Sequence, residues 1–312
     1  MTAETHARIA APWLRAPEVR AVFDALGAEA YFVGGCVRNA LLGREGSDID
    51  LATPLVPEEV TRRLEAAGLK AVPTGLEHGT VTAVSRGRGI EITTFRADVE
   101  TDGRHAVVRF TTELEEDARR RDFTMNALYA NAEGRVLDPV GGLPDLRAGR
   151  VRFIGGPEAR IREDYLRILR FFRFSAWYGR NGIDAEGLAA CAALAEGVEG
   201  LARERVGHEM RKLLAAPDPA PAVAAMAAAG VLARVLPGAD AAVLAPLVHL
   251  EGEARAAPDW LRRLAALGAE DAGGALRLSR AEDRALRRIA GLAGSGEAPA
   301  LLAEEGGAEA AR

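Results

Sequence analysis

The chain has 312 residues, of which 48% are hydrophobic and 27% are charged, as is usual for a globular protein. This composition excludes a disordered chain and a fibrous repeat, and the length is enough for two domains or for a head with a helical extension. The formal net charge is −5, so a surface that binds nucleic acid has to be local, because the bulk charge repels phosphate. Cys36 and Cys191 have no metal-ligand or disulfide spacing and are expected to be free thiols.

The chain lacks apolar stretches suited to secretion or membrane insertion. Its first fifteen residues contain no apolar core of signal-peptide length, and the charge-poor stretch 213–233 holds Asp218 and three prolines. A bilayer span needs about 20 apolar residues without such interruptions. The sequence therefore predicts a soluble cytoplasmic protein with no membrane partner.

Between residues 29 and 150, short strand-like runs alternate with helical patterns. The apolar run 31–35 ends in two glycines, and residues 47–53 show the polar–apolar alternation of a half-buried strand. Strands are predicted over 31–35, 47–53, 79–87 and 89–98, helices over 36–43, 57–69 and 114–130, and a Pro/Gly turn region over 136–149. This order predicts an α+β fold, with a small mixed or antiparallel sheet and helices on one face.

After Gly156 the patterns are helical throughout. Helices are predicted over 161–179, 185–198, 203–214 and 221–236. The expected domains are a head over residues 1–150, a helical neck over 151–240 and a helical body remnant over 241–312. The last residues, 294–312, are rich in Gly, Ala and Glu and are expected to be frayed or disordered.

A pair of carboxylates follows a glycine turn. Asp48 and Asp50 lie two apart on a predicted strand, so their side chains should point to the same side. Adjacent carboxylates repel each other unless a cation lies between them, and oxygen ligands favour Mg²⁺. The preceding Gly34 and Gly35 open a helix whose first turn carries Arg38, an arrangement suited to a phosphate. A D-x-D pattern alone is more often a solvated edge strand, but this combination predicts metal-assisted phosphoryl or nucleotidyl transfer.

Glu91 is open to two interpretations. It lies on a later predicted strand, with Ile90 and Ile92 facing the other way. It is either a third carboxylate that helps to hold metal or an exposed polar position in an alternating strand. The sequence favours neither.

An arginine stripe occupies one of the predicted helices. Asp164, Arg167, Arg170 and Arg173 recur every three residues, so they form a slowly winding stripe. One interpretation is a solvated basic face with an Asp164–Arg167 pair. The other is recognition of a base, because cytosine and adenine both place an amine donor beside a ring-nitrogen acceptor on their pairing edge. A fixed Asp–Arg pair would admit these two and reject uracil and guanine, leaving Arg170 and Arg173 free for triphosphate or an RNA backbone.

Four segments in this order resemble motifs of the class II tRNA nucleotidyltransferases, the CCA-adding enzymes of the bacterial poly(A) polymerase-like superfamily. They resemble the metal-binding motif (34–50), the ribose-recognition motif (119–128), the head–neck hinge motif (138–146) and the protein-template motif (163–174). The resemblance covers residues 29 to 175. It implies a nucleotidyltransferase head and an RNA-binding neck that transfer CMP twice and AMP once, from CTP and ATP, to the 3′ end of tRNA.

The resemblance also implies roles for individual residues. Asp48 and Asp50 would be catalytic and hold Mg²⁺, with Glu91 the open third ligand. The nucleotide would be bound by Gly35, Arg38, Arg121, Asp122, Asp164, Arg167, Arg170 and Arg173. Within that set, Asp122 would accept a hydrogen bond from the ribose 2′-hydroxyl, and Asp164 and Arg167 would read the base.

The chain departs from the family pattern at two places. Asn39 stands where the metal motif more usually has Asp. An Asn side chain keeps a hydrogen-bond acceptor but lacks the negative charge of Asp. The tail that grips the tRNA elbow looks short. Three alternatives stay open: a bacterial poly(A) polymerase, a CC-adding or A-adding enzyme, and a tRNA-binding protein with a dead site. The segment 95–110 looks like a full-length loop, which favours addition of A.

Overall fold

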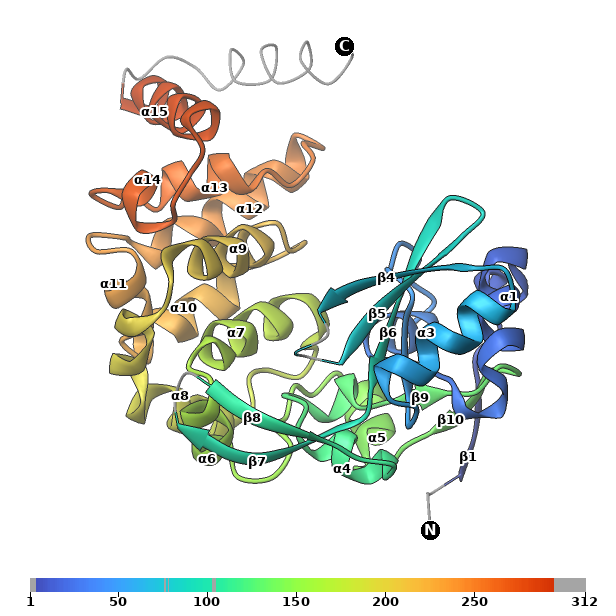
Figure 1. Cartoon of the computed structure of the whole chain (residues 1–312). Coiled ribbons are helices and arrows are strands. Elements are labelled where there is room, and N and C mark those ends of the chain that lie inside the picture. Colours follow the sequence, from blue (N-terminus) through green and yellow to red (C-terminus); the bar gives the residue numbers. More distant parts are fainter. Residues whose placement is uncertain (1–3, 76, 78, 103–104, 295–312) are drawn as a thin grey trace. The chain divides into compact units, whose positions relative to one another are not determined.

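A computed structural model of the chain describes residues 4–75, 77, 79–102 and 105–294. The chain divides into two compact units, Met1–Glu163 and Asp164–Arg312 (Figure 1). In the part described, no helix is both long and apolar enough to cross a bilayer. Residues 295–312, for which the sequence suggests a frayed end, lie outside the described residues.

The first unit is built on an eight-stranded mixed sheet in the order β1-β10-β9-β2-β3-β6-β5-β4. Neighbouring strands are antiparallel except β3 and β6, which are parallel. The strands are β1 Glu4–Arg8, β2 Tyr31–Val33, β3 Asp50–Thr53, β4 Lys70–Gly75, β5 Thr80–Ser85, β6 Arg88–Thr94, β9 Tyr129–Ala130 and β10 Arg135–Leu137. A separate hairpin joins β7 Arg96–Asp102 to β8 His105–Phe110. The expected α+β class is confirmed.

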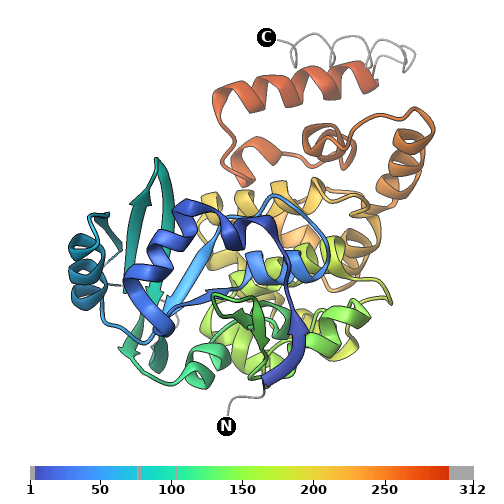
Figure 2. The same cartoon turned by 90° about the vertical axis from the view of Figure 1, so that its right-hand side faces the viewer.

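Two helices pack on the sheet at the β4–β6 end. The helices of this unit are α1 Pro17–Leu26, α2 Gly35–Leu41, α3 Pro57–Ala66, α4 Leu114–Arg119, α5 Gly142–Ala148 and α6 Pro157–Glu163. Helix α3 begins with Pro57 and buries Val60 and Leu64 one turn apart, the spacing that gives a helix one apolar face. Figure 1 shows α1 and α3 beside β4–β6, and Figure 2 shows the dark-blue α1 lying across the same strands.

The two faces of the sheet carry different side chains. On β6, Ile90 and Ile92 are buried, and Glu91 between them points to the opposite face. On β3, Ala52 belongs to a second buried cluster with Phe95 and Tyr129. Because side chains alternate along a strand, Asp50 shares the face of Ala52. One face therefore carries both a packed cluster and the acidic side chains.

The helix predicted over 114–130 is wrong beyond Arg119. The chain leaves α4 there, forms the 3₁₀ turn η4 (Thr124–Asn126) and then enters β9. The side chain of Asp122 accepts a hydrogen bond from its neighbour's backbone N–H (2.8 Å), which competes with helical pairing. The backbone of Thr124 bonds instead to Arg152 (3.0 Å), a partner that the local pattern cannot reveal.

Other elements differ from prediction in extent. The strand predicted over 47–53 begins only at Asp50, so the alternation argument does not apply to Asp48. The predicted loop 95–110 is the β7–β8 hairpin, and the turn region 136–149 includes the end of β10 and all of α5. Strands β1 and β4, also missed, are edge strands with weak apolar patterns.

The second unit is helical, as predicted, and no strand occurs between residues 157 and 294. Its helices are α7 Leu166–Tyr178, α8 Ala185–Ala193, α9 Arg203–Leu214, α10 Ala220–Ala228, α11 Val231–Val235, α12 Leu244–Glu253, α13 Trp260–Ala266, α14 Ala272–Ala275 and α15 Arg280–Gly294. Figure 2 shows α15, in red, along its length. Helices α7 and α9 pack together, and the indole of Trp177 donates a hydrogen bond to the carbonyl of Lys212 (2.7 Å).

Candidate active site

The predicted strand–glycine–helix turn is present. Strand β2 ends at Val33, and Gly34 then adopts φ 70° and ψ −120°, a conformation open to glycine alone, before α2 begins at Gly35. A Cβ atom on Gly34 would lie 3.7 Å from NH1 of Arg121, and one on Gly35 would lie 3.8 Å from NH2 of Arg38. Two guanidinium groups therefore flank the turn.

Three carboxylates lie close together near the glycine turn. In the parallel pairing of β3 and β6, Asp50 lies opposite Glu91, so the two side chains project from the same face. Burial raises the pKa of Asp50, and the nearby carboxylates of Glu91 and Asp48 raise it further, while Arg121 lowers it. Glu91 is exposed and lies opposite Asp50, a position that is compatible with each of the two interpretations that the sequence left open.

The donor set fits a hard divalent cation. Within the described residues, no three His, Cys, Asp or Glu side chains converge into a preformed metal cage. Mg²⁺ is usually held by one or two carboxylates and completed by substrate phosphates and water, so a preformed cage is not required. A cation bound at Asp50 would relieve the repulsion from Glu91 and Asp48 that disfavours its ionised form.

Asn39 connects the glycine-turn helix to the loop before the carboxylates. Its amide nitrogen donates to Oγ of Ser47 (2.5 Å), and its amide oxygen accepts from Nε of Arg38 (3.1 Å). An amide can donate and accept at once, whereas an ionised carboxylate can only accept. The residue that departs from the family pattern thus ties Arg38 to Ser47 through a neutral side chain.

Asp122 is connected to Arg38 through Asn126. Both Asp122 and Arg38 are only 7% exposed. Asn126 donates its amide to Oδ1 of Asp122 (2.9 Å) and accepts from NH1 of Arg38 (2.5 Å). Sequence reasoning did not single out Asn126, although a lone amide in the apolar run from Phe123 to Leu128 is a signal for a structural or binding role.

Arg121 is held by two residues that the sequence analysis missed. Its Nε and NH2 donate to Oδ2 of Asp117 (3.2 and 2.9 Å), and its Nε also donates to the hydroxyl of Tyr129 (3.0 Å). Burial opposes ionisation of Asp117, but Arg121 and Arg120 hold its pKa well below the usual range. The available signal was an acidic residue four positions before Arg121, the spacing of an intrahelical pair.

The template segment of the second unit begins differently from prediction. Helix α6 ends at Glu163 and α7 starts at Leu166, so Asp164 is not the first member of a continuous helical stripe. Its Oδ1 accepts from the backbone N–H of Leu166 (3.1 Å), and its Oδ2 accepts from NH2 of Arg205 (2.7 Å). The carboxylate thus bonds the backbone N–H of the first residue of α7, although the N-cap residue of this helix is Tyr165. Arg205 was not anticipated.

Arg170 and Arg173 are not free of a counter-charge, contrary to the prediction. Nε of Arg173 lies 2.6 Å from Oε2 of Glu209, and NH1 of Arg170 lies 3.9 Å from Oε1. Glu209 comes from α9 and is 3% exposed. It falls between Val206 and Met210 on the buried side of that helix, where a lone acid is the signal that was overlooked.

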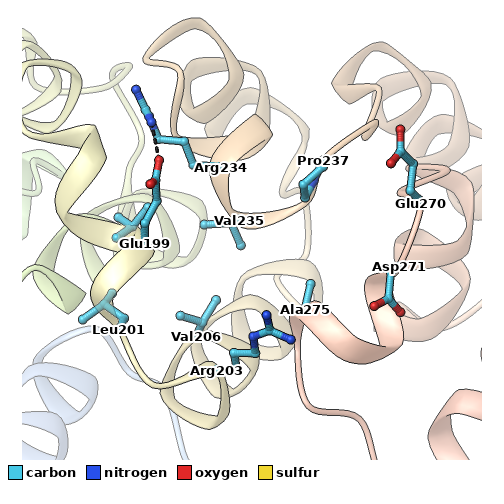
Figure 3. A pocket seen from close by; sticks show the side chains of 11 residues that line it. Glu199, Leu201, Arg203, Val206, Arg234, Val235, Pro237, Glu270, Asp271 and Ala275 are labelled. Atoms are coloured by element: carbon cyan, nitrogen blue, oxygen red, sulfur yellow. Dashed lines mark hydrogen bonds and ion pairs between the residues drawn. The ribbon is translucent and has the colours of Figure 1, made fainter.

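The helical unit also has a pocket of about 310 Å³ that contains none of the predicted site residues. Figure 3 shows Glu199 and Arg234 pointing toward one another at its rim as an ion pair. Arg203 donates to the carbonyl of Gly274 (3.3 Å), and Asp271 accepts from the backbone of the same residue (3.0 Å). Because these polar groups are engaged within the protein, we assign no ligand to this pocket.

Comparison with known proteins finds a family match in each of the two units. Residues 30–152 match the family described as "Poly A polymerase head domain", and residues 182–243 match "Probable RNA and SrmB- binding site of polymerase A". Over 192 residues the chain is 43% identical to human mitochondrial CCA tRNA nucleotidyltransferase 1, covering 60% of this chain and 44% of that protein. Over 243 residues it is 42% identical to the CCA-adding enzyme of Geobacillus thermodenitrificans, covering 77% and 55%.

A solved structure is similar to nearly the whole of this chain. The CCA-adding enzyme of Bacillus stearothermophilus, determined in complex with CTP, is 34% identical with a TM-score of 0.74. The alignment covers 91% of this chain and 71% of that one. The chain spans about half the length of the named relatives that it matches in sequence.

Proposed function

Because the chain belongs to the CCA-adding enzyme family, we propose that it adds C, C and A to the 3′ end of tRNA from CTP and ATP. The observation that carries this proposal is the Asp50–Glu91 pair, with Asp48 and Arg121 beside it, next to the Gly34 turn. Acidic groups and guanidinium groups around one glycine turn suit a triphosphate with its cation.

We assign Mg²⁺ as the metal. Nucleotidyltransferases of this family generally use a divalent ion. Asp48 and Asp50 would hold it, with Glu91 as the third carboxylate. When bound, the ion supplies positive charge that stabilises the developing charge on the transferred and departing phosphates.

The protein's own groups bind and orient the nucleotide. Gly34 and Gly35 let the phosphates approach the backbone, while Arg38 and Arg121 each present one guanidinium nitrogen to the turn. Asp122 accepts from the ribose 2′-hydroxyl. The tRNA 3′-oxygen then forms a bond to the α-phosphorus as the bond to pyrophosphate breaks, with no covalent enzyme intermediate.

We assign base selection to Asp164 and Arg167, with Arg170 and Arg173 completing the nucleotide pocket. We further propose that residues 1–150 are the transferase head, 151–240 the RNA-binding neck and 241–312 the body remnant. The match of residues 182–243 to an RNA-binding family supports the second assignment. We further propose a cytoplasmic location for this activity.

The test uses tRNA that lacks its last three nucleotides. CTP alone should extend it by two residues, ATP alone by none, and the two together by three, as read on a denaturing gel. Long adenylate tails would indicate a poly(A) polymerase, and a product that stops after two cytidines with both nucleotides present would indicate a CC-adding enzyme. No extension with any nucleotide, despite tRNA binding, would indicate a dead site.

A further inference from the structure

Asp117 accepts hydrogen bonds from four residues in three parts of the first unit. Its Oδ1 accepts from the backbone N–H of Arg96, at the start of the β7–β8 hairpin (3.2 Å), and from Nε of Arg120 (2.8 Å). Its Oδ2 accepts from Arg121 and from the hydroxyl of Tyr129 (2.7 Å). The side chain is 1% exposed, so none of these bonds competes with bulk water.

The contacts of Asp117 determine where Arg121 points. Its guanidinium is a rigid planar fork, so fixing two nitrogens fixes the direction of the third. Asp117 and Tyr129 take Nε and NH2, and NH1 is the atom that faces the Gly34 turn. Arg121 is also close enough to Asp50 to lower its pKa, so the same guanidinium borders the carboxylate group.

We propose that Asp117, assisted by Tyr129, is a positioning residue that aims NH1 of Arg121 at the phosphates of the incoming nucleotide. The inference rests on the proposed function. The phosphates and sugar are common to CTP and ATP, so the loss of Asp117 should weaken both substrates alike and leave base selection unchanged. An effect transmitted through the hairpin that begins at Arg96 would instead fall on one nucleotide.

The experiment measures KM and kcat of the 312-residue chain for CTP on tRNA lacking CCA and for ATP on tRNA ending in CC. The variants are Asp117→Asn, Tyr129→Phe, Arg121→Lys and the Asp117→Asn/Arg121→Lys double variant. Losing a charge-assisted bond should raise KM for both nucleotides between about tenfold and a hundredfold in Asp117→Asn, with kcat changed far less. In the Arg121→Lys background the same substitution should add less than about twofold, because its effect acts through Arg121.

Val22→Ala is the matched control for stability, since Val22 is fully buried on α1. It should lower the melting temperature and leave both KM values unchanged. If Asp117→Asn fails to fold, Tyr129→Phe carries the test, and it should raise both KM values severalfold in the same ratio.

Three results would overturn the inference. The first is that folded Asp117→Asn, or Tyr129→Phe, keeps the wild-type KM values. The second is that Asp117→Asn raises KM as much in the Arg121→Lys background as in the wild type, and the third is that KM rises for only one of the two nucleotides. If wild-type protein extends no tRNA, the proposed function fails by itself. In that case the dissociation constant of CTP, measured by calorimetry for wild type and for Asp117→Asn, still tests the positioning role, because the variant should bind CTP more weakly.

Discussion

Replacing Glu209 by Ala should destabilise the helical unit far more than a surface substitution does. The carboxylate is buried and lies 2.6 Å from Nε of Arg173, whose side chain is 15% exposed, so its removal takes a close counter-charge away from a mostly buried guanidinium. Breaking a buried pair in this way costs about 3–5 kcal/mol. Arg170 adds little, because it is 3.9 Å away with a side chain 32% exposed, and exposed pairs are worth under about 1 kcal/mol.

This cost is measurable through Trp177, which bridges α7 and α9 close to the pair. In a background with Trp13→Phe and Trp260→Phe, its fluorescence reports unfolding of the helical unit in the full chain. Glu209→Ala should lower the melting temperature by roughly 6–20 °C. The paired substitution Arg173→Met/Glu209→Met should recover most of the loss, because it buries no unpaired charge. The reasoning fails if Glu209→Ala costs less than about 1 kcal/mol, or if the paired variant is no more stable than the single one.

Four further outcomes follow from the proposed site. Asp50→Ala should abolish incorporation and leave tRNA binding nearly intact by gel shift, so turnover within about tenfold of wild type would remove the metal assignment. Asp122→Ala should narrow the gap between CTP and dCTP use, whereas an equal loss of both would make Asp122 structural. Asp164→Ala should reduce the CTP-to-UTP ratio of kcat/KM by one to two decades, the worth of a charge-assisted bond of about 1.5–3 kcal/mol, and an unchanged ratio would reject base reading. Deleting residues 101–105 from the hairpin should spare both cytidines and impair the final A, and an equal loss of all three additions would indicate a folding role.

The parts of the fold that local periodicity controls could be predicted. Ile90, Glu91 and Ile92 alternate between faces as expected, because the period of a strand is a backbone property. The glycine turn was found for a similar reason, since the backbone at Gly34 is open to glycine alone. The long helix after Leu114 was overextended, because hydrogen bonds to distant backbone and to the Asp122 side chain replace helical pairing there. The strand of Asp48 was also overextended, since β3 begins only at Asp50.

The partners of Arg173 and Asp164, both proposed to contact the nucleotide, could not be predicted, because they are set by packing between elements. Arg173 meets Glu209 from another helix, and Asp164 meets Arg205, which is 41 residues away. The sequence analysis paired Asp164 with Arg167, since spacing along a helix is the only contact that one sequence displays. Its donor–acceptor argument assumed that Asp164 is fixed against Arg167, whereas the Asp164 carboxylate accepts from the backbone of Leu166 and from Arg205, so base reading by the pair stays a prediction.

Asp117 and Glu209 share one physical task in separate units. Each is a buried carboxylate that holds an arginine proposed to face substrate, Arg121 in one unit and Arg173 in the other. A free arginine side chain has about 2 kcal/mol of rotamer entropy to lose on binding a phosphate. When a buried acid already fixes the guanidinium, that ordering occurs on folding, and the nucleotide meets groups that are in place. The acid also withdraws some positive charge from the site, so these arginines favour orientation over long-range attraction, in keeping with a chain whose net charge is −5.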